Sequence, residues 1–150
     1  INILHYKEDI DMVDQNCAYC MEGELVAKFG IKICELETSK VYLFKEQSHP
    51  GRCIVAHKKH VGDMNELTAE ERAAYFEDVA RVARAIMKAF NPDKVNYGAY
   101  GDTGHHLHFH LCPKYKDEYE WGGVFLMNPD KKYLTDAEYA EMIEKIKANL

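Results

Sequence analysis

The chain has 150 residues, of which 47% are hydrophobic and 29% charged, a balance typical of a globular protein of one domain. Its formal net charge of −6 argues against nucleic acid as a partner, because a general nucleic-acid surface needs a basic face. The sequence has neither an apolar run of the roughly 20 residues that a membrane helix needs nor an opening signal-peptide pattern, so no membrane partner is expected. Since the five cysteines are an odd number and no secretion signal is present, we expect reduced thiols and a cytoplasmic location.

An irregular arm and a group of short strands are predicted for the first part of the chain. Residues 1–16 are polar and mixed, which is typical of an N-terminal arm. From Leu25 to Lys59 the stretches LVAKF, IKICELE, VYLF and RCIVA are apolar or alternating, and turn residues separate them. Three or four short strands joined by tight turns indicate an antiparallel meander.

The clearest helix is predicted to run from Thr68 to Phe90. Thr68 and Glu71 fit a capping box at its start, and Asn91-Pro92 ends it. One apolar stripe is expected to face the core, formed by Phe76, Val79, Ala80, Ala83, Ile86, Met87 and Phe90.

The rest of the chain adds two strands and a second helix. The stretches KVNYGAY and HHLHFHL are typical of strands, and Pro113 is expected to end the second one. Thr135 and Glu138 form another capping box, which predicts a helix within a C-terminal tail spanning residues 116–150. The order of elements predicts one α+β domain over residues 1–150, with an antiparallel sheet of about five strands and the helices packed on it.

Three histidines alternate with apolar residues in the second of these strands. His106, His108 and His110 share one face, while Leu107, Phe109 and Leu111 face the core. An ordinary solvated face would carry mixed polar residues, so three imidazoles in register indicate a special role. One metal ion cannot bind all three, because residues i and i+4 of a strand lie about 13 Å apart and zinc–nitrogen bonds are only about 2.0–2.1 Å long.

Catalysis is the remaining interpretation of the histidine strand. A neutral imidazole can attack an electrophile through one nitrogen when a fixed acceptor holds the proton on the other nitrogen. The preceding loop, NYGAYGDTG, contains Gly98, Gly101 and Gly104, and its bare N–H groups suit a phosphate. Together the loop and the strand indicate phosphoryl chemistry.

The motif His106-Leu-His108-Phe-His110-Leu-Cys112 resembles that of the histidine triad (HIT) superfamily of nucleotide hydrolases and nucleotidyl transferases. The stretches CIVAHKKHVGDMNEL and NYGAYGDTG also resemble family segments, and the likeness extends from about Cys17 to Tyr115. The tail resembles one bacterial branch more loosely. The resemblance implies a HIT-like fold, with a long central helix and a C-terminal helix, and a homodimer.

The resemblance also implies roles for individual residues. His108 matches the nucleophile that attacks the α-phosphate and forms a covalent nucleotidyl-histidine, and the carbonyl of His106 would accept from its other nitrogen. His110 would contact the phosphate or the leaving group. The substrate-binding positions of the family correspond here to Asn96, Gly101, Thr103 and Gly104.

One departure from the family pattern concerns the ribose. Phe44 and Lys45 stand where many relatives place an Asp or Asn on the ribose hydroxyls, so the nucleoside preference stays open.

Cys17 and Cys20 have the C-x2-C spacing of half a zinc site. Two ordinary thiols and a redox pair are the alternatives, although no βαβ pattern surrounds the pair. In zinc-containing relatives the ligand set continues at positions that match His60 and His106 here, so the resemblance implies one structural Zn²⁺. His57 is the rival ligand, and its place at a strand end favours the surface.

The expected function is that of a nucleotide phosphohydrolase of small-molecule nucleotide conjugates, of the dinucleoside polyphosphate or nucleoside phosphoramidate type. The alternatives are a nucleotidyl transferase to a phosphate acceptor and a nucleotide-binding module with vestigial activity. Trp121 is a candidate for the rim of the site, and packing within the tail is the other interpretation.

Overall fold

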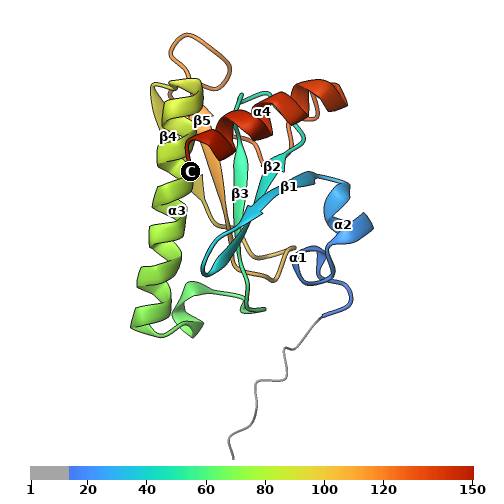
Figure 1. Ribbon diagram of the computed structural model, residues 1–150, viewed down its shortest axis with the longest axis vertical. Helices are drawn as coiled ribbons and strands as arrows, with labels where there is room; N and C mark the ends of the chain where they lie inside the picture. The colour runs from blue at the N-terminus through green and yellow to red at the C-terminus, as the bar shows by residue number, and fades with distance from the viewer. Residues whose placement is uncertain (1–13) are drawn as a thin grey trace, which may run out of the picture.

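The computed structural model describes residues 14–150, so most of the predicted N-terminal arm lies outside the described residues. Figure 1 shows the elements in chain order: α1 (Ala18–Met21), α2 (Gly23–Ala27), β1 (Gly30–Glu35), β2 (Ser39–Phe44), β3 (Cys53–His57), the 3-10 turn η1 (Met64–Glu66), α3 (Ala69–Phe90), β4 (Lys94–Gly98), β5 (His108–Lys114) and α4 (Asp136–Ala148). No helix in this part of the chain has both the length and the apolar character needed to cross a bilayer.

The five strands form one antiparallel sheet in the order β1-β2-β3-β5-β4, which confirms the predicted α+β fold. The strand that carries His108 and His110, β5, lies between β3 and β4, and His106 precedes the strand by two residues. In register, Ala56 lies opposite His108, and both Ile54 and Gly98 lie opposite His110. The inner position of β5 leaves its backbone little freedom, since both neighbouring strands bond to it.

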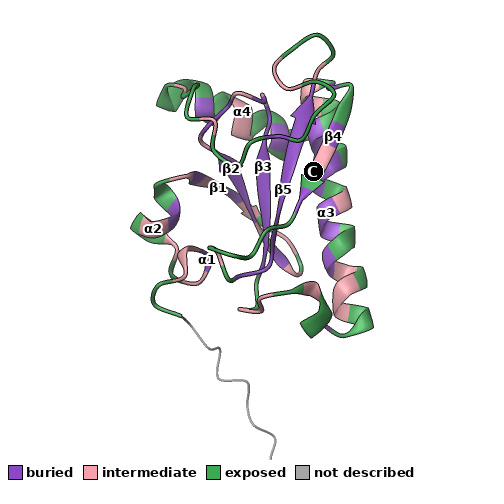
Figure 2. Cartoon of the chain, turned by 180° about the vertical axis from the view of Figure 1, so that it is seen from behind, coloured by how far each residue is buried: buried purple, intermediate pink, exposed green. Residues whose placement is uncertain are grey.

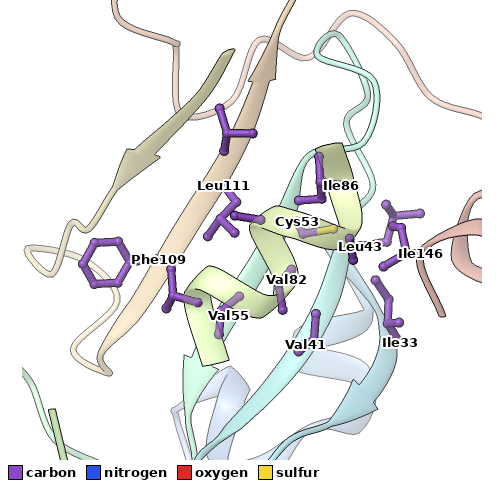
Figure 3. Packing of buried hydrophobic residues seen from close by; sticks show 14 of the residues in the cluster. Ile33, Val41, Leu43, Cys53, Val55, Val82, Ile86, Phe109, Leu111 and Ile146 are labelled. Carbon is purple, nitrogen blue, oxygen red and sulfur yellow. The ribbon is translucent and has the colours of Figure 1, made fainter. Parts of the chain in front are cut away.

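One face of the sheet packs against α3 and α4 and contains the main core, shown in Figure 3. Both long helices begin at the predicted capping boxes: Thr68 accepts from the amide of Glu71, and Thr135 accepts from the amide of Glu138. The fully buried residues of this core include Val41, Leu43, Val55, Val82, Ile86, Leu111 and Ile146.

The opposite face of the sheet carries the histidines and is also covered. A second apolar cluster joins α1 and α2 to β2 and β3; it consists of Tyr19, Val26, Tyr42, Phe44, Ile54 and Ala56. Seen from behind in Figure 2, β2, β3 and β5 are buried along their length. The helices α1 and α2 therefore cover part of the histidine face.

Two element predictions were wrong. The stretch LVAKF forms no strand. Its first three residues belong to α2, and Val26 is the buried residue of this helix, packed in the apolar cluster on β2 and β3. In addition, β5 continues through Pro113 to Lys114. Pairing with β3 ends at Cys53 and Leu111, so Pro113 lies where β5 has a partner on one side only, a position that tolerates proline.

The apolar stripe of α3 is rotated from the predicted one. Phe76 and Met87 are 39% and 41% exposed, whereas Tyr75 and Val82 are fully buried. Tyr75 can enter the core because its hydroxyl donates to the carbonyl of Val55 at 2.7 Å, which satisfies the polar end of the ring.

Candidate active site and metal centre

A cavity of about 850 Å³ opens on the histidine face of the sheet. His106, His108 and His110 line it together, and the loop that contains Thr103 and Gly104 also lines it. The size is within the range of about 300–1,000 Å³ that small-molecule sites occupy. The predicted histidine strand and glycine loop therefore meet at one concave site.

His108 has a fixed proton at the floor of this cavity. Its Nδ1 donates to the carbonyl oxygen of His106 at 2.6 Å, the hydrogen bond that the family resemblance implied. A carbonyl only accepts, so Nδ1 carries the proton and Nε2 carries the lone pair. Burial lowers the pKa of His108 below its ordinary value, which keeps the ring neutral and its lone pair available.

His106 turns toward a different set of partners. Its Nε2 donates to the carbonyl of His57 at 2.6 Å, so its Nδ1 carries a lone pair. That nitrogen lies 3.3 Å from the sulfur of Cys17 and 3.1 Å from Nδ1 of His60. The sulfur of Cys20 completes the group at 3.2 Å from Nδ1 of His60.

These four residues form a group that can hold a metal ion. The ligand atoms of Cys17, Cys20, His60 and His106 all lie within 4.8 Å of one another. Ligand atoms around a tetrahedral zinc ion are about 3.3–3.8 Å apart, given zinc–nitrogen and zinc–sulfur bonds of about 2.0–2.3 Å. The carbonyl that holds Nε2 of His106 orients the ring, as outer partners of metal-binding histidines commonly do.

The rival ligand, His57, is excluded by its position. Its side chain is buried, which contradicts the expected surface role, and its ring lies 5.2 Å from that of Tyr75. Its Nδ1 accepts from the amide of Lys59 at 2.9 Å. The ring therefore points into the helix-covered side of the sheet and away from Cys17 and Cys20.

His110 is buried between an aromatic ring and a guanidinium group. Its ring lies edge-on to Phe44, with centroids 5.4 Å apart, and its Nδ1 lies 3.0 Å from a terminal guanidinium nitrogen of Arg52. Burial first, and the charge of Arg52 second, lower the pKa of His110 to about 2. His110 is therefore neutral near pH 7.

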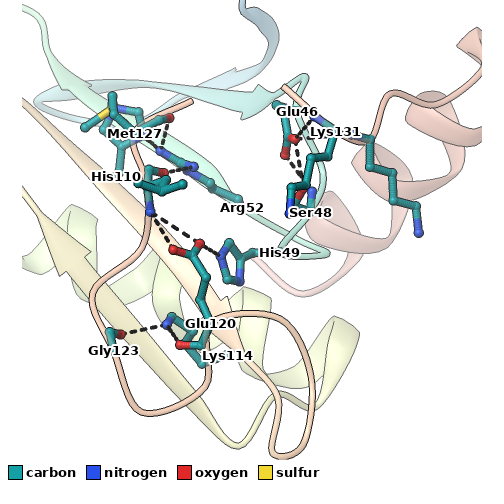
Figure 4. Close-up of polar contacts among 12 residues, drawn as sticks. Glu46, Ser48, His49, Arg52, His110, Lys114, Glu120, Gly123, Met127 and Lys131 are labelled. Atoms are coloured by element: carbon teal, nitrogen blue, oxygen red, sulfur yellow. Dashed lines mark hydrogen bonds and ion pairs between the residues drawn. The ribbon is translucent and has the colours of Figure 1, made fainter. Parts of the chain in front are cut away.

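A segment near the C-terminus closes one side of the cavity. We call residues 116–135 the C-terminal strap; Phe125, Leu126 and Met127 of the strap line the cavity. Buried polar side chains of the sheet and its loops bind the strap, as Figure 4 shows. The bonds run from Arg52 to the carbonyls of Leu126 and Met127, from Lys114 to those of Glu120 and Gly123, and between His49 and Glu120 at 2.8 Å.

The predicted phosphate-contacting residues do not all reach the cavity. Thr103 and Gly104 line it, whereas Asn96 and Gly101 are not among its lining residues. Asn96 is half-buried in β4 opposite Cys112, two positions along β5 from His110. Its contact with the phosphate stays a prediction.

The sequence left the role of some residues undecided and gave no indication that others belong to the site. Phe44 and Lys45 line the cavity, and Trp121 does not, being 42% exposed on the strap. Arg52 and Tyr19 were not recognised as site residues. The ring of Tyr19 lies 4.9 Å from that of His108, a contact that depends on how α1 folds back over the sheet and that has no local signal.

Acid is expected to destabilise the fold from about pH 6.5 downward, partly through His110. The unfolded imidazole has a pKa of about 6.5, and the folded one has a pKa of about 2. Below about pH 6.5 the unfolded state therefore binds a proton that the folded state does not, so unfolding is favoured as the pH falls. The contribution of His110 between about pH 7.5 and about pH 5.5 should be about 1.4 kcal/mol.

Urea unfolding at the two pH values measures this loss. His110→Gln removes the titrating group and should therefore lose less stability over the same pH step, although the other histidines still titrate. Equal losses in the two proteins would show that the protonation of His110 is not linked to folding.

The sequence matches the HIT domain family over residues 30–117. Protein hit of Bacillus subtilis is 28% identical over 123 residues, which are 77% of this chain and 83% of that protein. Adenosine 5'-monophosphoramidase hnt1 of Schizosaccharomyces pombe is 28% identical over 116 residues, which are 71% of this chain and 80% of that protein. Bis(5'-adenosyl)-triphosphatase of Dictyostelium discoideum is 28% identical over 98 residues, which are 62% of this chain and 65% of that protein.

Solved structures have the same fold. A histidine triad protein from Sinorhizobium meliloti superposes with a TM-score of 0.78 at 23% identity, covering 85% of this chain and 95% of that one. A zinc-bound histidine triad family protein from Mycobacterium smegmatis superposes with a TM-score of 0.63 at 21% identity, covering 88% of this chain and 93% of that one. At these identities the likeness establishes the arrangement of the sheet and helices.

Proposed function

The chain belongs to the HIT domain family, and from this premise we propose that it is an enzyme that hydrolyses nucleotide conjugates at the α-phosphate through a covalent nucleotidyl-histidine on His108. One observation carries the proposal. His108 has its Nδ1 proton bonded to the carbonyl of His106, which leaves the lone pair on Nε2, and the ring lines a cavity of about 850 Å³. A neutral imidazole held in this way can act as a nucleophile.

The reaction proceeds in two displacements. Nε2 of His108 attacks the α-phosphorus, a nitrogen–phosphorus bond forms, and the leaving group departs with the electrons of its bond to phosphorus. The carbonyl of His106 stabilises the positive charge that develops on the ring, because it holds the Nδ1 proton. Water then attacks the same phosphorus, the nitrogen–phosphorus bond breaks, and the nucleoside monophosphate leaves.

Thr103 and Gly104 are proposed to contact the phosphoryl oxygens, since both line the cavity beside His108. At Gly104 the loop backbone lies close to the proposed nucleophile, since a Cβ there would lie 3.5 Å from Cε1 of His108.

The substrate class is proposed from the relatives named above. Two of them are named for a phosphoramidate and a dinucleoside triphosphate substrate, and both substrates carry an adenosine α-phosphate. Adenosine phosphoramidate and diadenosine triphosphate are therefore the substrates to test first. Assayed in water enriched in oxygen-18, either substrate should give adenosine monophosphate with one labelled phosphoryl oxygen.

Two other outcomes would replace the proposal. If added inorganic phosphate or a sugar phosphate captures the nucleotidyl group in preference to water, the protein is a transferase. If adenosine monophosphate binds but neither substrate is consumed, the protein is a nucleotide-binding module.

We also propose that one structural Zn²⁺ is bound by Cys17, Cys20, His60 and His106. The donor set is closed, with two thiolates and two imidazoles, which is typical of structural zinc and leaves no position for substrate. When bound, zinc would cross-link α1 to His106, which lies two residues before the catalytic strand. The phosphoryl transfer itself is carried out by the histidines and the loop.

A homodimer and a cytoplasmic location complete the proposal. The strand β4 is an edge of the sheet, and Tyr97 and Tyr100 at its end are 52% and 48% exposed, which fits a surface covered by a second copy. Light scattering would give the mass in solution. All five cysteines are free thiols, as a reducing compartment requires.

A further inference from the structure

The burial of the charged side chain of Arg52 is energetically unfavourable. The side chain is fully buried, and its guanidinium lies between the rings of Phe44 and Phe125, at 4.2 Å and 4.9 Å from their centroids. None of the ion pairs within residues 14–150 includes Arg52. Moving a guanidinium out of water without a carboxylate partner carries a large desolvation penalty, so the position of Arg52 in the site needs an explanation.

Its terminal nitrogens face two backbone carbonyls, one imidazole nitrogen and the sulfur of Met127, which lies 3.6 Å away. One donates to the carbonyl of Leu126 at 3.1 Å, and the other lies 2.9 Å from the carbonyl of Met127 and 3.0 Å from Nδ1 of His110. Figure 4 shows this fork between the catalytic strand and the strap. The same nitrogen therefore contacts both a reacting residue and the segment that closes the cavity.

The chemistry of the guanidinium determines the state of His110. A guanidinium has only donors, so Nδ1 of His110 must accept, and the imidazole proton must be on Nε2. A second proton on Nδ1 would place two N–H groups against each other beside a fixed positive charge. The lowering of the pKa of His110 to about 2, by burial and by Arg52, agrees with this.

We propose that Arg52 is a positioning residue that holds His110 as a neutral imidazole with its proton on Nε2, and that it does so while seating the strap. The effect on catalysis rests on the function proposed above. Nε2 of His110 has no hydrogen-bond partner within residues 14–150, and the ring lines the cavity. Its proton is thus available to a phosphoryl oxygen or to the bridging atom of the leaving group, where charge develops in the transition state.

His108 and His110 then carry their protons on opposite ring nitrogens. His108 carries its proton on Nδ1 and attacks through Nε2, because the carbonyl of His106 accepts. His110 carries its proton on Nε2 and donates with it, because Arg52 is a donor. Neighbouring rings whose centroids are 5.4 Å apart thus present a lone pair and a proton to the same substrate.

Nitrogen NMR on histidine-labelled protein tests the proposal directly. Long-range proton–nitrogen correlation at neutral pH distinguishes a ring protonated on Nδ1 from one protonated on Nε2, and His110→Gln identifies the signals of His110. The wild type should show His110 protonated on Nε2. A wild type protonated on Nδ1, or doubly protonated, would overturn the proposal without any change to Arg52.

Variants of Arg52 then test the cause. Arg52→Met keeps the length and removes every donor, so His110 should shift to a mixture of tautomers. Arg52→Lys keeps a cationic donor and should preserve the Nε2 form in part. Glu120→Gln is the matched control, because it weakens the strap bond to His49 without touching His110. An unchanged tautomer in Arg52→Met, or an equal shift in Glu120→Gln, would show that Arg52 does not set the proton.

Activity is measured separately as the single-turnover rate of adduct formation on His108. Arg52→Met should lower this rate by about 100-fold, the cost of losing one transition-state donor, and Arg52→Lys should recover part of it. A wild type that forms no adduct would refute the proposed function and leave the nitrogen spectra as a valid test of Arg52. A normal adduct rate in Arg52→Met would refute the catalytic role of Arg52 alone.

Discussion

Replacing His108 with alanine is expected to abolish turnover, by about 10⁴-fold or more, because the nucleophile of the first displacement is lost. The fold should tolerate the change, since α3 and α4 pack on the other face of the sheet. His108→Gly should still bind the nucleotide, because the cavity and its loop remain. Mass spectrometry after an acid-free quench should find a nucleotidyl adduct on His108 in the wild type and none in either variant.

The matched control for this experiment is His105→Ala. His105 is exposed and lines the same cavity, but it has no assigned role in either displacement, so its variant should still form the adduct on His108. Full turnover by His108→Ala would refute the assignment of the nucleophile. An adduct on another residue would show that the cavity is reactive but that His108 is not the group that attacks.

The sequence predicts the catalytic strand well because the relevant signals are local. A period of two places three imidazoles on one face and three apolar residues on the other, and the register with β3 and β4 keeps them there. The two capping boxes are equally local and mark where α3 and α4 begin. The C-x2-C pair is local too, and the resemblance to a family identified the distant histidines that join it.

The strap and Arg52 had no comparable signal. Arg52 donates to backbone carbonyls of residues that are 74 and 75 positions away, and any residue type offers a carbonyl. The sequence around Arg52 is a short apolar strand, in which one arginine is usually an exposed end. The helix α2 was not predicted for a related reason. LVAKF has the composition of a strand, and the contact of Val26 with the face of the sheet joins residues that are far apart in the sequence.

Both missed features lie on the histidine side of the sheet. On the side covered by α3 and α4, buried residues are apolar and recur at regular spacing along the sequence. The elements of this side can therefore be predicted, although the buried stripe of α3 differs from the predicted one. The histidine side is covered by the strap through buried polar groups, each with its own long-range partner. The cavity therefore depends on contacts that no short pattern encodes, and substrate preference is expected to vary with the strap.

Removing zinc is expected to have the largest effect on stability. Metal binding in a closed site of two thiolates and two imidazoles contributes directly to the free energy of folding. Cys17→Ser should lose the metal and at least about 3 kcal/mol of stability, which is a fall in Tm of about 10 °C for a domain of this size. Elemental analysis gives the zinc content, and calorimetry before and after a strong chelator gives the stability.

Cys34→Ser is the matched control, because Cys34 is a half-buried thiol of β1 that lies outside the metal-binding group. That variant should retain one zinc per chain and respond to the chelator as the wild type does. Cys17→Ser should still form some adduct on His108, because the proposed zinc would hold His106, two residues before the strand, and would take no part in the displacement. A wild type isolated without zinc, and unchanged in Tm after chelation, would show that Cys17 and Cys20 are ordinary thiols. In that case His106 would act through its carbonyl alone, by holding the proton of His108.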